Sequence, residues 1–103
     1  MSVTVVRYET KPERADENQA RVEAVFAELA EVAPAGLRYM TLRLEDGVTF
    51  VHVAAVETAD GSNPLVDAIA FKEFQRELGE RLVESPLVMA ATVVGSYGFP
   101  VAP

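Results

Sequence analysis

The dipeptide Asp46-Gly47 constrains the fold of this chain more than any other feature of the sequence. It separates two segments in which residue types alternate, LRYMTLRL (residues 37–44) and VTFVHVAAVE (residues 48–57). Asp-Gly between two such segments is the strongest short-range signal for a β-hairpin. If the turn contains only these two residues, the register of the hairpin is fixed, and Thr41 lies opposite His52.

The hairpin divides its side chains into two sets, because successive side chains of a strand point to opposite faces of the sheet. One set is aliphatic: Met40, Leu42, Leu44, Val51, Val53 and Ala55. The other set mixes aromatic, hydroxyl, guanidinium and imidazole groups: Tyr39, Thr41, Arg43, Phe50, His52 and Ala54. We expect the aliphatic set to lie under helices and the mixed set to lie on the opposite face of the sheet.

The other elements are predicted from hydrophobic periodicity and turn residues. Strands are expected over residues 3–9 and 86–97, and helices over residues 10–33 and after a cap at Ser62 or Asn63. Thr10 and Glu13 have the spacing of a capping box, and the turn PAG (residues 34–36) ends the first helix. The order β-α-β-β-α-β predicts an α+β, ferredoxin-like fold: one domain, residues 1–103, with a four-stranded antiparallel sheet.

Both helices are predicted to be amphipathic. The first has apolar residues at helical spacing, namely Val22, Val25, Phe26, Leu29 and Val32, and Glu28 is expected on its surface. The second has Phe71, Phe74, Leu78 and Leu82 on one face. Glu77 precedes Arg81 by one turn there, a spacing at which side chains on a helix surface interact.

The final strand is apolar on both of its faces, so a single copy of the chain would leave an apolar sheet face in water. An exposed apolar patch of several hundred Å² normally marks an interface. We therefore expect a second copy to cover this face, which makes the chain a homodimer.

Composition excludes several classes of function. The formal net charge is −7, from sixteen acidic and nine basic residues, which disfavours nucleic-acid and anionic membrane partners. With no cysteine and one histidine, a disulfide, a thiolate nucleophile or a multi-histidine metal site in one subunit is excluded. No metal and no cofactor is predicted. The sequence has no signal-peptide pattern and no apolar run near the ~18 residues of a membrane span, so we expect a cytoplasmic protein.

The chain resembles the dimeric α+β barrel superfamily, and most of all its antibiotic biosynthesis monooxygenase-like branch. The segments that carry the resemblance are KPE (11–13), PAG (34–36), FVHVAAVE (50–57) and AFKEFQREL (70–78), followed by the apolar last strand. They are short, and their order and spacing from Val3 to about Gly98 carry the weight. The resemblance implies a homodimer with its sheets face to face, its helices outside, and a cavity between sheet and helices or near the dimer seam.

In relatives, such cavities accept aromatic polyketides, quinols, haem or small acids, and many work without a metal or organic cofactor. This chain departs from several of them. It has no tryptophan, which several oxygenases of the family carry in or near the pocket. It also lacks the first-strand asparagine of haem-degrading relatives and the second-helix histidine that would bind the haem iron. Haem degradation is therefore disfavoured.

Five residues of the mixed face are the candidate site. His52 is a candidate acid/base, and the alternative is a buried imidazole whose nitrogens are satisfied by neighbours such as Thr41. Arg43 could clamp a carboxylate or phenolate; the alternative is an edge-strand arginine that reaches solvent or forms a salt bridge across the dimer. Tyr39 could orient a substrate hydroxyl, or be an interface aromatic; Phe50 completes the face. Arg7 and Tyr8 lie on opposite faces of the first strand, and the sequence leaves open which one joins them.

Two functions follow as hypotheses, and the sequence leaves open whether the chain is an enzyme. One is a cofactor-free, monooxygenase-like enzyme that acts on a small aromatic or enolisable compound. The alternative is a non-catalytic barrel that binds a small apolar molecule or assists another enzyme. A third reading is a monomeric ferredoxin-like regulatory module.

Overall fold

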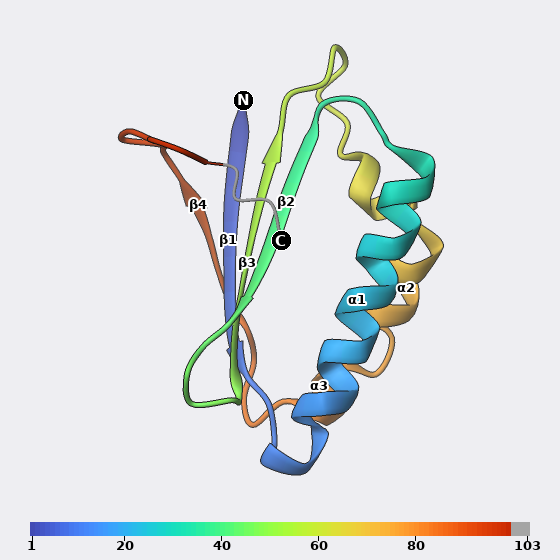
Figure 1. The fold of residues 1–103 in the computed structure, drawn as a ribbon, viewed down its shortest axis with the longest axis vertical. Coiled ribbons are helices and arrows are strands. Elements are labelled where there is room, and N and C mark those ends of the chain that lie inside the picture. The colour runs from blue at the N-terminus through green and yellow to red at the C-terminus, as the bar shows by residue number, and fades with distance from the viewer. Residues whose placement is uncertain (100–103) are drawn as a thin grey trace.

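The structure, a computed structural model, describes residues 1–99. Its strands are β1 (Ser2–Glu9), β2 (Leu37–Arg43), β3 (Thr49–Val56) and β4 (Leu87–Ala91). Its helices are α1 (Ala15–Val32), α2 (Ile69–Gln75) and α3 (Leu78–Arg81), with 3-10 turns η1 (Pro12–Arg14) and η2 (Pro64–Asp67). The strands form one antiparallel sheet in the order β2-β3-β1-β4, and the helices form a second layer on one side of it (Figure 1). The predicted ferredoxin-like α+β fold is confirmed.

The predicted hairpin register is confirmed, although the turn is built differently. Thr41 pairs with His52, as the sequence predicts. Leu44 N donates to Thr49 O, so the loop contains residues 45–48 rather than two residues. The Asp46 carboxylate accepts from the backbone N–H groups of the residues that follow, Val48 and Thr49. Because the longer loop also has an even number of residues, the register is unchanged.

The assignment of the two faces is wrong. The mixed set, which includes His52 and Phe50, lies under the helices, where both residues are buried. Phe50 belongs to the same core as Val22 and Val25 of α1. The rings of this set pack between the layers, and the polar atoms of His52 find partners there.

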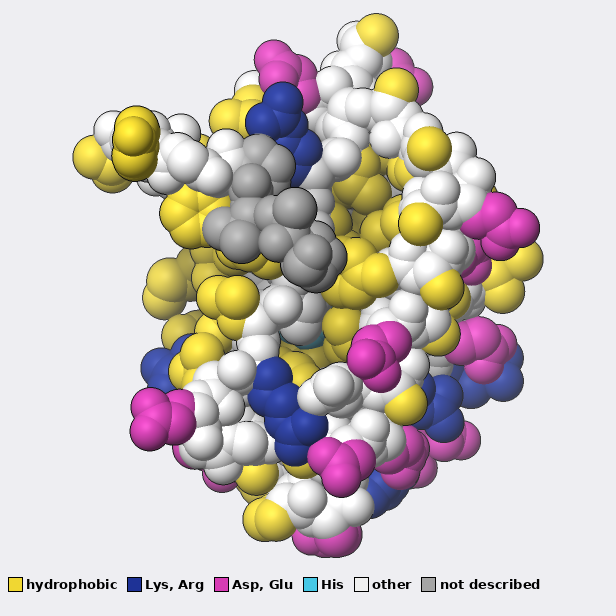
Figure 2. All heavy atoms as spheres, in the orientation of Figure 1, with side chains coloured by type: hydrophobic (Ala, Val, Ile, Leu, Met, Phe, Trp, Pro, Cys, Tyr) yellow, Lys and Arg dark blue, Asp and Glu magenta, His cyan; other side chains and the backbone are white. Residues whose placement is uncertain are grey.

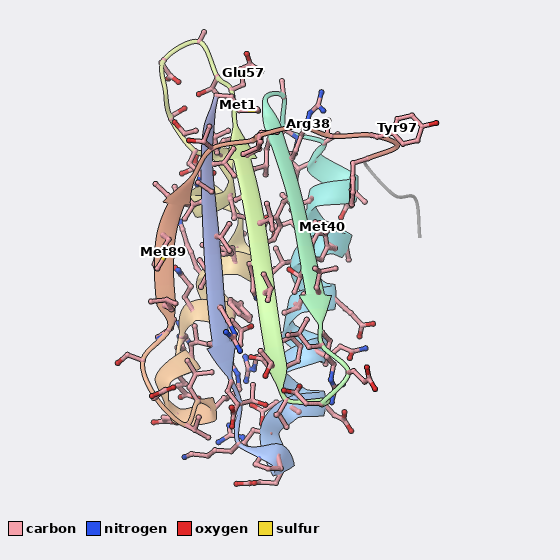
Figure 3. The ribbon with its side chains drawn as sticks, turned by 90° about the vertical axis from the view of Figure 1, so that its left-hand side faces the viewer. Met1, Arg38, Met40, Glu57, Met89 and Tyr97 are labelled. Carbon is pink, nitrogen blue, oxygen red and sulfur yellow. The ribbon has the colours of Figure 1, made fainter. Side chains whose placement is uncertain are left out.

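The aliphatic set lies on the other side of the sheet, which the chain does not cover. We call this surface the open face. Its apolar residues, which point away from the helices, are Val3, Val5, Met40, Leu42, Val51, Val53, Ala55, Leu87, Met89 and Ala91, and Arg7 and Arg38 lie on the same face. Figure 3 looks onto it, with Met40 and Met89 on the near side. Met89 is 57% exposed, as expected for an apolar surface that lacks a covering layer.

The start of the first helix also differs from the prediction. Thr10 does not cap the helix; its side chain donates to Val48 O, and its backbone forms a bridge with Leu82. The η1 turn then leads into α1. The predicted end is confirmed, because α1 stops at Val32 and Ala33 adopts the left-handed conformation.

The second predicted helix is broken into η2, α2 and α3. Asn63 caps η2 by accepting from Leu65 N, as one of the two predicted caps. The interruption between α2 and α3 lies at Arg76 and Glu77, where Glu77 has a φ of 61°. None of the helices in the described part of the chain is long and apolar enough to cross a membrane.

The last strand is shorter than predicted. β4 ends at Ala91, which pairs with Val3 near the start of β1. Since β1 begins at Ser2, a longer β4 would have almost no backbone groups to pair with. The chain after β4 therefore leaves the sheet, and Tyr97 projects away from it with 98% of its surface exposed (Figure 3). The end of the chain, residues 100–103, lies outside the described residues.

Candidate binding cavity

A cavity of about 400 Å³ lies between the sheet and the helical layer. Such a volume is within the range of small-molecule sites in proteins. Hydrophobic side chains gather around the hollow between the two layers (Figure 2). The lining residues nearest the sheet are Thr4, Val6, Tyr8, Tyr39, His52 and Ala54, and those from the helical side include Leu65, Phe71, Phe74, Gln75 and Leu78. No charged side chain of the described residues lines the cavity.

His52 lies at the polar end of this apolar cavity. Strand alternation in β3 places it between Val51 and Val53 and points it toward the helices. Its Nε2 is 2.7 Å from Tyr8 Oη, and its Nδ1 is 2.5 Å from Tyr39 Oη. Both ring nitrogens therefore have a tyrosine partner, and the site is a Tyr-His-Tyr cluster.

Two neighbours complete the environment of the imidazole. Thr41 Oγ1 is 3.1 Å from His52 Nδ1, as their cross-strand pairing predicts. The ring of Phe74, from α2, lies with its centroid 5.4 Å from that of the imidazole. Since aromatic rings and β-strands surround it, the imidazole is 5% exposed.

The cluster continues behind the cavity through side chains from two helices. Asn18, on α1, donates from Nδ2 to Tyr8 Oη over 2.9 Å. Arg81, on α3, donates from Nε to Asn18 Oδ1 over 3.0 Å. Both Asn18 and Arg81 are fully buried. A continuous chain of hydrogen bonds therefore runs from Arg81 to Tyr39.

Burial keeps the groups at the cavity uncharged. It lowers the pKa of His52 to about 4, so the ring is neutral at pH 7. It raises the pKa of Tyr39 to about 12, an effect that the Thr41 hydroxyl opposes. Burial also raises the pKa of Tyr8 above its ordinary value, although the hydrogen bond from Asn18 acts in the opposite direction. The cavity thus offers polar contacts without a net charge.

The structure brings together some of the residues that the sequence proposed as a site. Tyr39, Thr41 and His52 are in contact, and Tyr39 and His52 line the cavity. Phe50 is not in the lining; its ring stacks on Tyr8, with centroids 5.6 Å apart.

Arg43 is also outside the lining. Its Nη1 contacts Asp16 Oδ1 at 3.1 Å and Gln19 Oε1 at 2.6 Å, so its ion pair lies within the chain rather than across a dimer. The sequence left open whether Arg7 or Tyr8 joins the site. Tyr8 lines the cavity, and Arg7 lies on the other face of β1.

Sequence reasoning missed Asn18 and Arg81. The available signal was the same for both: each is a polar residue at a position where the helical pattern expects an apolar one. Asn18 is spaced with Ala15, Val22 and Val25, which are all buried on α1. Arg81 lies three residues after Leu78 on α3 and is buried, although its spacing from Glu77 is typical of a surface pair.

Metal ligands do not cluster anywhere in residues 1–99: no group of three or more His, Cys, Asp or Glu side chains could hold an ion there. The polar groups of the cavity are phenols, an imidazole, aliphatic hydroxyls and amides. These groups suit hydrogen bonding to an organic ligand.

Together, these features define a ferredoxin-like α+β protein with an uncharged, ligand-sized cavity under its helices and an uncovered aliphatic face on its sheet. No family model and no curated protein sequence matches the chain. Solved structures do match it. A Bacteroides thetaiotaomicron protein, provisionally named an antibiotic biosynthesis monooxygenase, aligns with a TM-score of 0.77 at 14% identity, over 98% of this chain and 95% of that one.

Two further structures are similar. A protein described as an antibiotic biosynthesis monooxygenase has a TM-score of 0.73 at 14% identity, over 92% of this chain and 100% of that one. The protein Rv0793 of Mycobacterium tuberculosis has a TM-score of 0.72 at 16% identity, over 92% of this chain and 96% of that one. The chain therefore has the same fold as proteins described as antibiotic biosynthesis monooxygenases, as its resemblance to that branch predicted.

Proposed function

We propose that this chain is a cytoplasmic, homodimeric protein that binds a small aromatic or enolisable compound in its cavity and oxygenates it with dioxygen, without a bound cofactor. The observation that carries the proposal is the cavity itself. Its walls are apolar and aromatic, and its polar end is a neutral cluster of Tyr8, Tyr39 and His52. The name of one structural neighbour, an antibiotic biosynthesis monooxygenase, supports the reaction class.

The residues of the cluster have separate roles in this proposal. Tyr39 donates to the ligand oxygen, and His52 is the acid/base that gives a proton to that oxygen through Tyr39 and later takes it back. Thr41 holds the imidazole from the side, while Phe71 and Phe74 pack against the ligand ring. A neutral imidazole suits this role, because it can both take up and give back a proton.

The reaction balances with dioxygen as the co-reactant. A CH₂ group activated by the enol becomes a carbonyl group; one atom of dioxygen enters the ligand, and the other leaves as water with the two hydrogens. The proton given to the ligand oxygen is taken back within the cycle, so His52 ends in its starting state.

A second candidate function is a non-catalytic ligand-binding protein. The observation that favours it is that both nitrogens of His52 already have partners and that its pKa is about 4, which makes it a weak base. On this alternative, the cluster only positions the ligand.

The open face supports the homodimer. It is mostly aliphatic, with Arg7 and Arg38 also on it, and it lies on the side opposite the helices. A second copy that packs its own open face there would bury both surfaces and leave each cavity under its own helices.

Anthrone, an enolisable aromatic ketone, tests the proposal. We expect it to bind, and the protein to accelerate oxygen uptake above the spontaneous rate. His52→Gln should bind anthrone but lose the acceleration, whereas Val66→Ala, an exposed change in η2, should retain it. Binding without accelerated uptake in the unmodified protein would favour the binding protein. Absence of binding to anthrone would contradict both functions for this class of ligand.

A further inference from the structure

Arg81 is a buried cation without a paired acid. Its side chain is fully buried, and no carboxylate of the described residues forms an ion pair with it. It donates instead to neutral acceptors: Asn18 Oδ1, and Phe74 O over 2.8 Å. Its own backbone is fixed as well, since Lys11 N donates to Arg81 O over 2.8 Å. The guanidinium is thus held rigidly behind the cavity, one residue removed from Tyr8.

A guanidinium can only donate hydrogen bonds, and this property sets the orientation of Asn18. The Asn18 oxygen must face Arg81, so its NH₂ group faces Tyr8 Oη. An NH₂ group can also only donate. Tyr8 Oη is therefore an acceptor from Asn18, and the Tyr8 hydroxyl hydrogen must point elsewhere.

The other polar atom beside Tyr8 Oη is His52 Nε2, at 2.7 Å. If Tyr8 donates to it, Nε2 carries no hydrogen, and the neutral ring carries its hydrogen on Nδ1. The opposite tautomer would place two donors against Tyr8 Oη and leave the Tyr8 hydrogen without an acceptor among the described hydrogen bonds. The geometry thus selects one tautomer of the imidazole.

The same donor-to-acceptor direction continues from His52 to the cavity. The Nδ1–H group of His52 faces Tyr39 Oη at 2.5 Å, so Tyr39 accepts from the ring. The hydroxyl hydrogen of Tyr39 is then available at the cavity. Every donor along the chain points the same way, from Arg81 to the ligand.

We propose that Arg81 and Asn18 are positioning residues, which orient this hydrogen-bond chain so that Tyr39 presents a donor to the cavity and selects ligands with an acceptor oxygen, such as a ketone or an enolate. The ligand class rests on the proposed binding function, whereas the tautomer of His52 does not. Neither Arg81 nor Asn18 lines the cavity, so both act through other residues.

Asn18→Asp is the decisive variant. It has nearly the same shape and gains an ion pair with Arg81, but its carboxylate can only accept. Tyr8 should then donate to Asp, and His52 should donate to Tyr8 from Nε2. Because the chain has one histidine, the ring nitrogens can be read from a long-range proton–nitrogen correlation spectrum of nitrogen-15-labelled protein.

We expect hydrogen on Nδ1 in the unmodified protein and on Nε2 in Asn18→Asp. Arg81→Lys, which keeps a donor and a charge, should retain hydrogen on Nδ1. A purely structural role of these residues would leave the tautomer the same in all three proteins. Hydrogen on Nε2 in the unmodified protein, or an unchanged tautomer in Asn18→Asp, would overturn the proposal.

Two probes of similar shape test the ligand class: the ketone α-tetralone and the hydrocarbon tetralin. One added hydrogen bond should make the ketone bind about threefold to tenfold more tightly to the unmodified protein. In Asn18→Asp this preference should disappear, because Tyr39 then donates to His52 Nδ1. Equal affinities in the unmodified protein, or no binding of either probe, would overturn the assignment of an acceptor ligand but not the tautomer.

Discussion

Glu28 of α1 caps the first turn of α2 at Ala70. Its Oε1 accepts from Ala70 N over 2.8 Å, and its Oε2 accepts from Ile69 N over 2.9 Å. The first N–H groups of a helix have no partner within the helix, and a carboxylate there also has a favourable interaction with the helix dipole. One side chain of α1 thus fixes the start of the helix that carries Phe71 and Phe74 to the cavity.

Removal of this cap should destabilise the fold. We expect Glu28→Ala to lower the free energy of unfolding by about 1–2 kcal/mol, measured by urea denaturation. Glu23→Ala, an exposed change on the same helix, should alter it by less than about 0.5 kcal/mol. Equal effects of the two substitutions would show that the contact to α2 contributes nothing.

The buried imidazole should make stability depend on pH. The pKa of His52 is about 4 in the folded chain, below the ordinary value of 6.5. The unfolded chain therefore binds the proton more readily, and the folded state loses stability as the pH falls from about 6.5 to 4. The full difference corresponds to about 3 kcal/mol.

Carboxylates titrate in part of the same range, so the measurement must isolate the histidine. We expect the free energy of unfolding to fall less steeply between pH 6.5 and 4.5 in His52→Gln than in the unmodified chain. Parallel curves for the two proteins would mean that His52 has an ordinary pKa when folded.

Alanine substitutions at three glycines distinguish the cost of a steric clash from the cost of backbone strain. Gly36 has a φ of 80°, and an added Cβ would lie 2.4 Å from Glu57 O. Gly47 has a φ of 78°, but open space surrounds it. Gly79, in α3, has neither constraint.

We expect Gly36→Ala to cost about 3 kcal/mol, because it combines strain with a clash against fixed backbone. Gly47→Ala should cost about 1 kcal/mol, and Gly79→Ala should be neutral or stabilising by up to about 1 kcal/mol. Thermal unfolding of the three variants gives the order directly. A loss at Gly36 no larger than that at Gly47 would contradict the close approach to Glu57.

The open face can be tested by placing a charge at its centre. Val53 lies on the inner strand β3, between Val5 and Met40 on the neighbouring strands. If two open faces pack together, Val53→Asp buries an unpaired carboxylate in each copy and should weaken association more than about a hundredfold.

Light scattering after gel filtration measures the mass directly. We expect a dimer for the unmodified chain, a monomer for Val53→Asp and a dimer for Val66→Asp, whose valine is exposed in η2. A monomeric mass for the unmodified protein would contradict the homodimer and favour a monomeric module.

The sequence predicts the hairpin register well because the pairing depends on local alternation and on an even-numbered loop, both of which are visible in residues 37–57. It does not predict which face the helices cover. Alternation shows only that Met40 and Tyr39 point in opposite directions, and both sets contain enough apolar surface to be buried. Packing between the sheet and the helices decides which set is buried, and in this fold it is the set with the aromatic rings.

The candidate site could be predicted in part for the same reason. Thr41 and His52 are cross-strand neighbours, so their contact follows from the register. Tyr8, Asn18 and Arg81 reach the site from β1, α1 and α3, and no local pattern places these elements beside one another. A polar residue within an apolar helical stripe was the available signal, and it indicates burial without naming the partner.

The sheet is a single layer that separates the open face from the cavity. Along β3, Val51 and Val53 belong to the open face, and His52 between them belongs to the cavity. In a scan of all single substitutions, scored separately for self-association and for ligand affinity, the positions sensitive to one property should alternate along each strand with those sensitive to the other. Neighbouring positions can thus change independently, so one strand can evolve a new ligand preference while its dimer contacts stay the same.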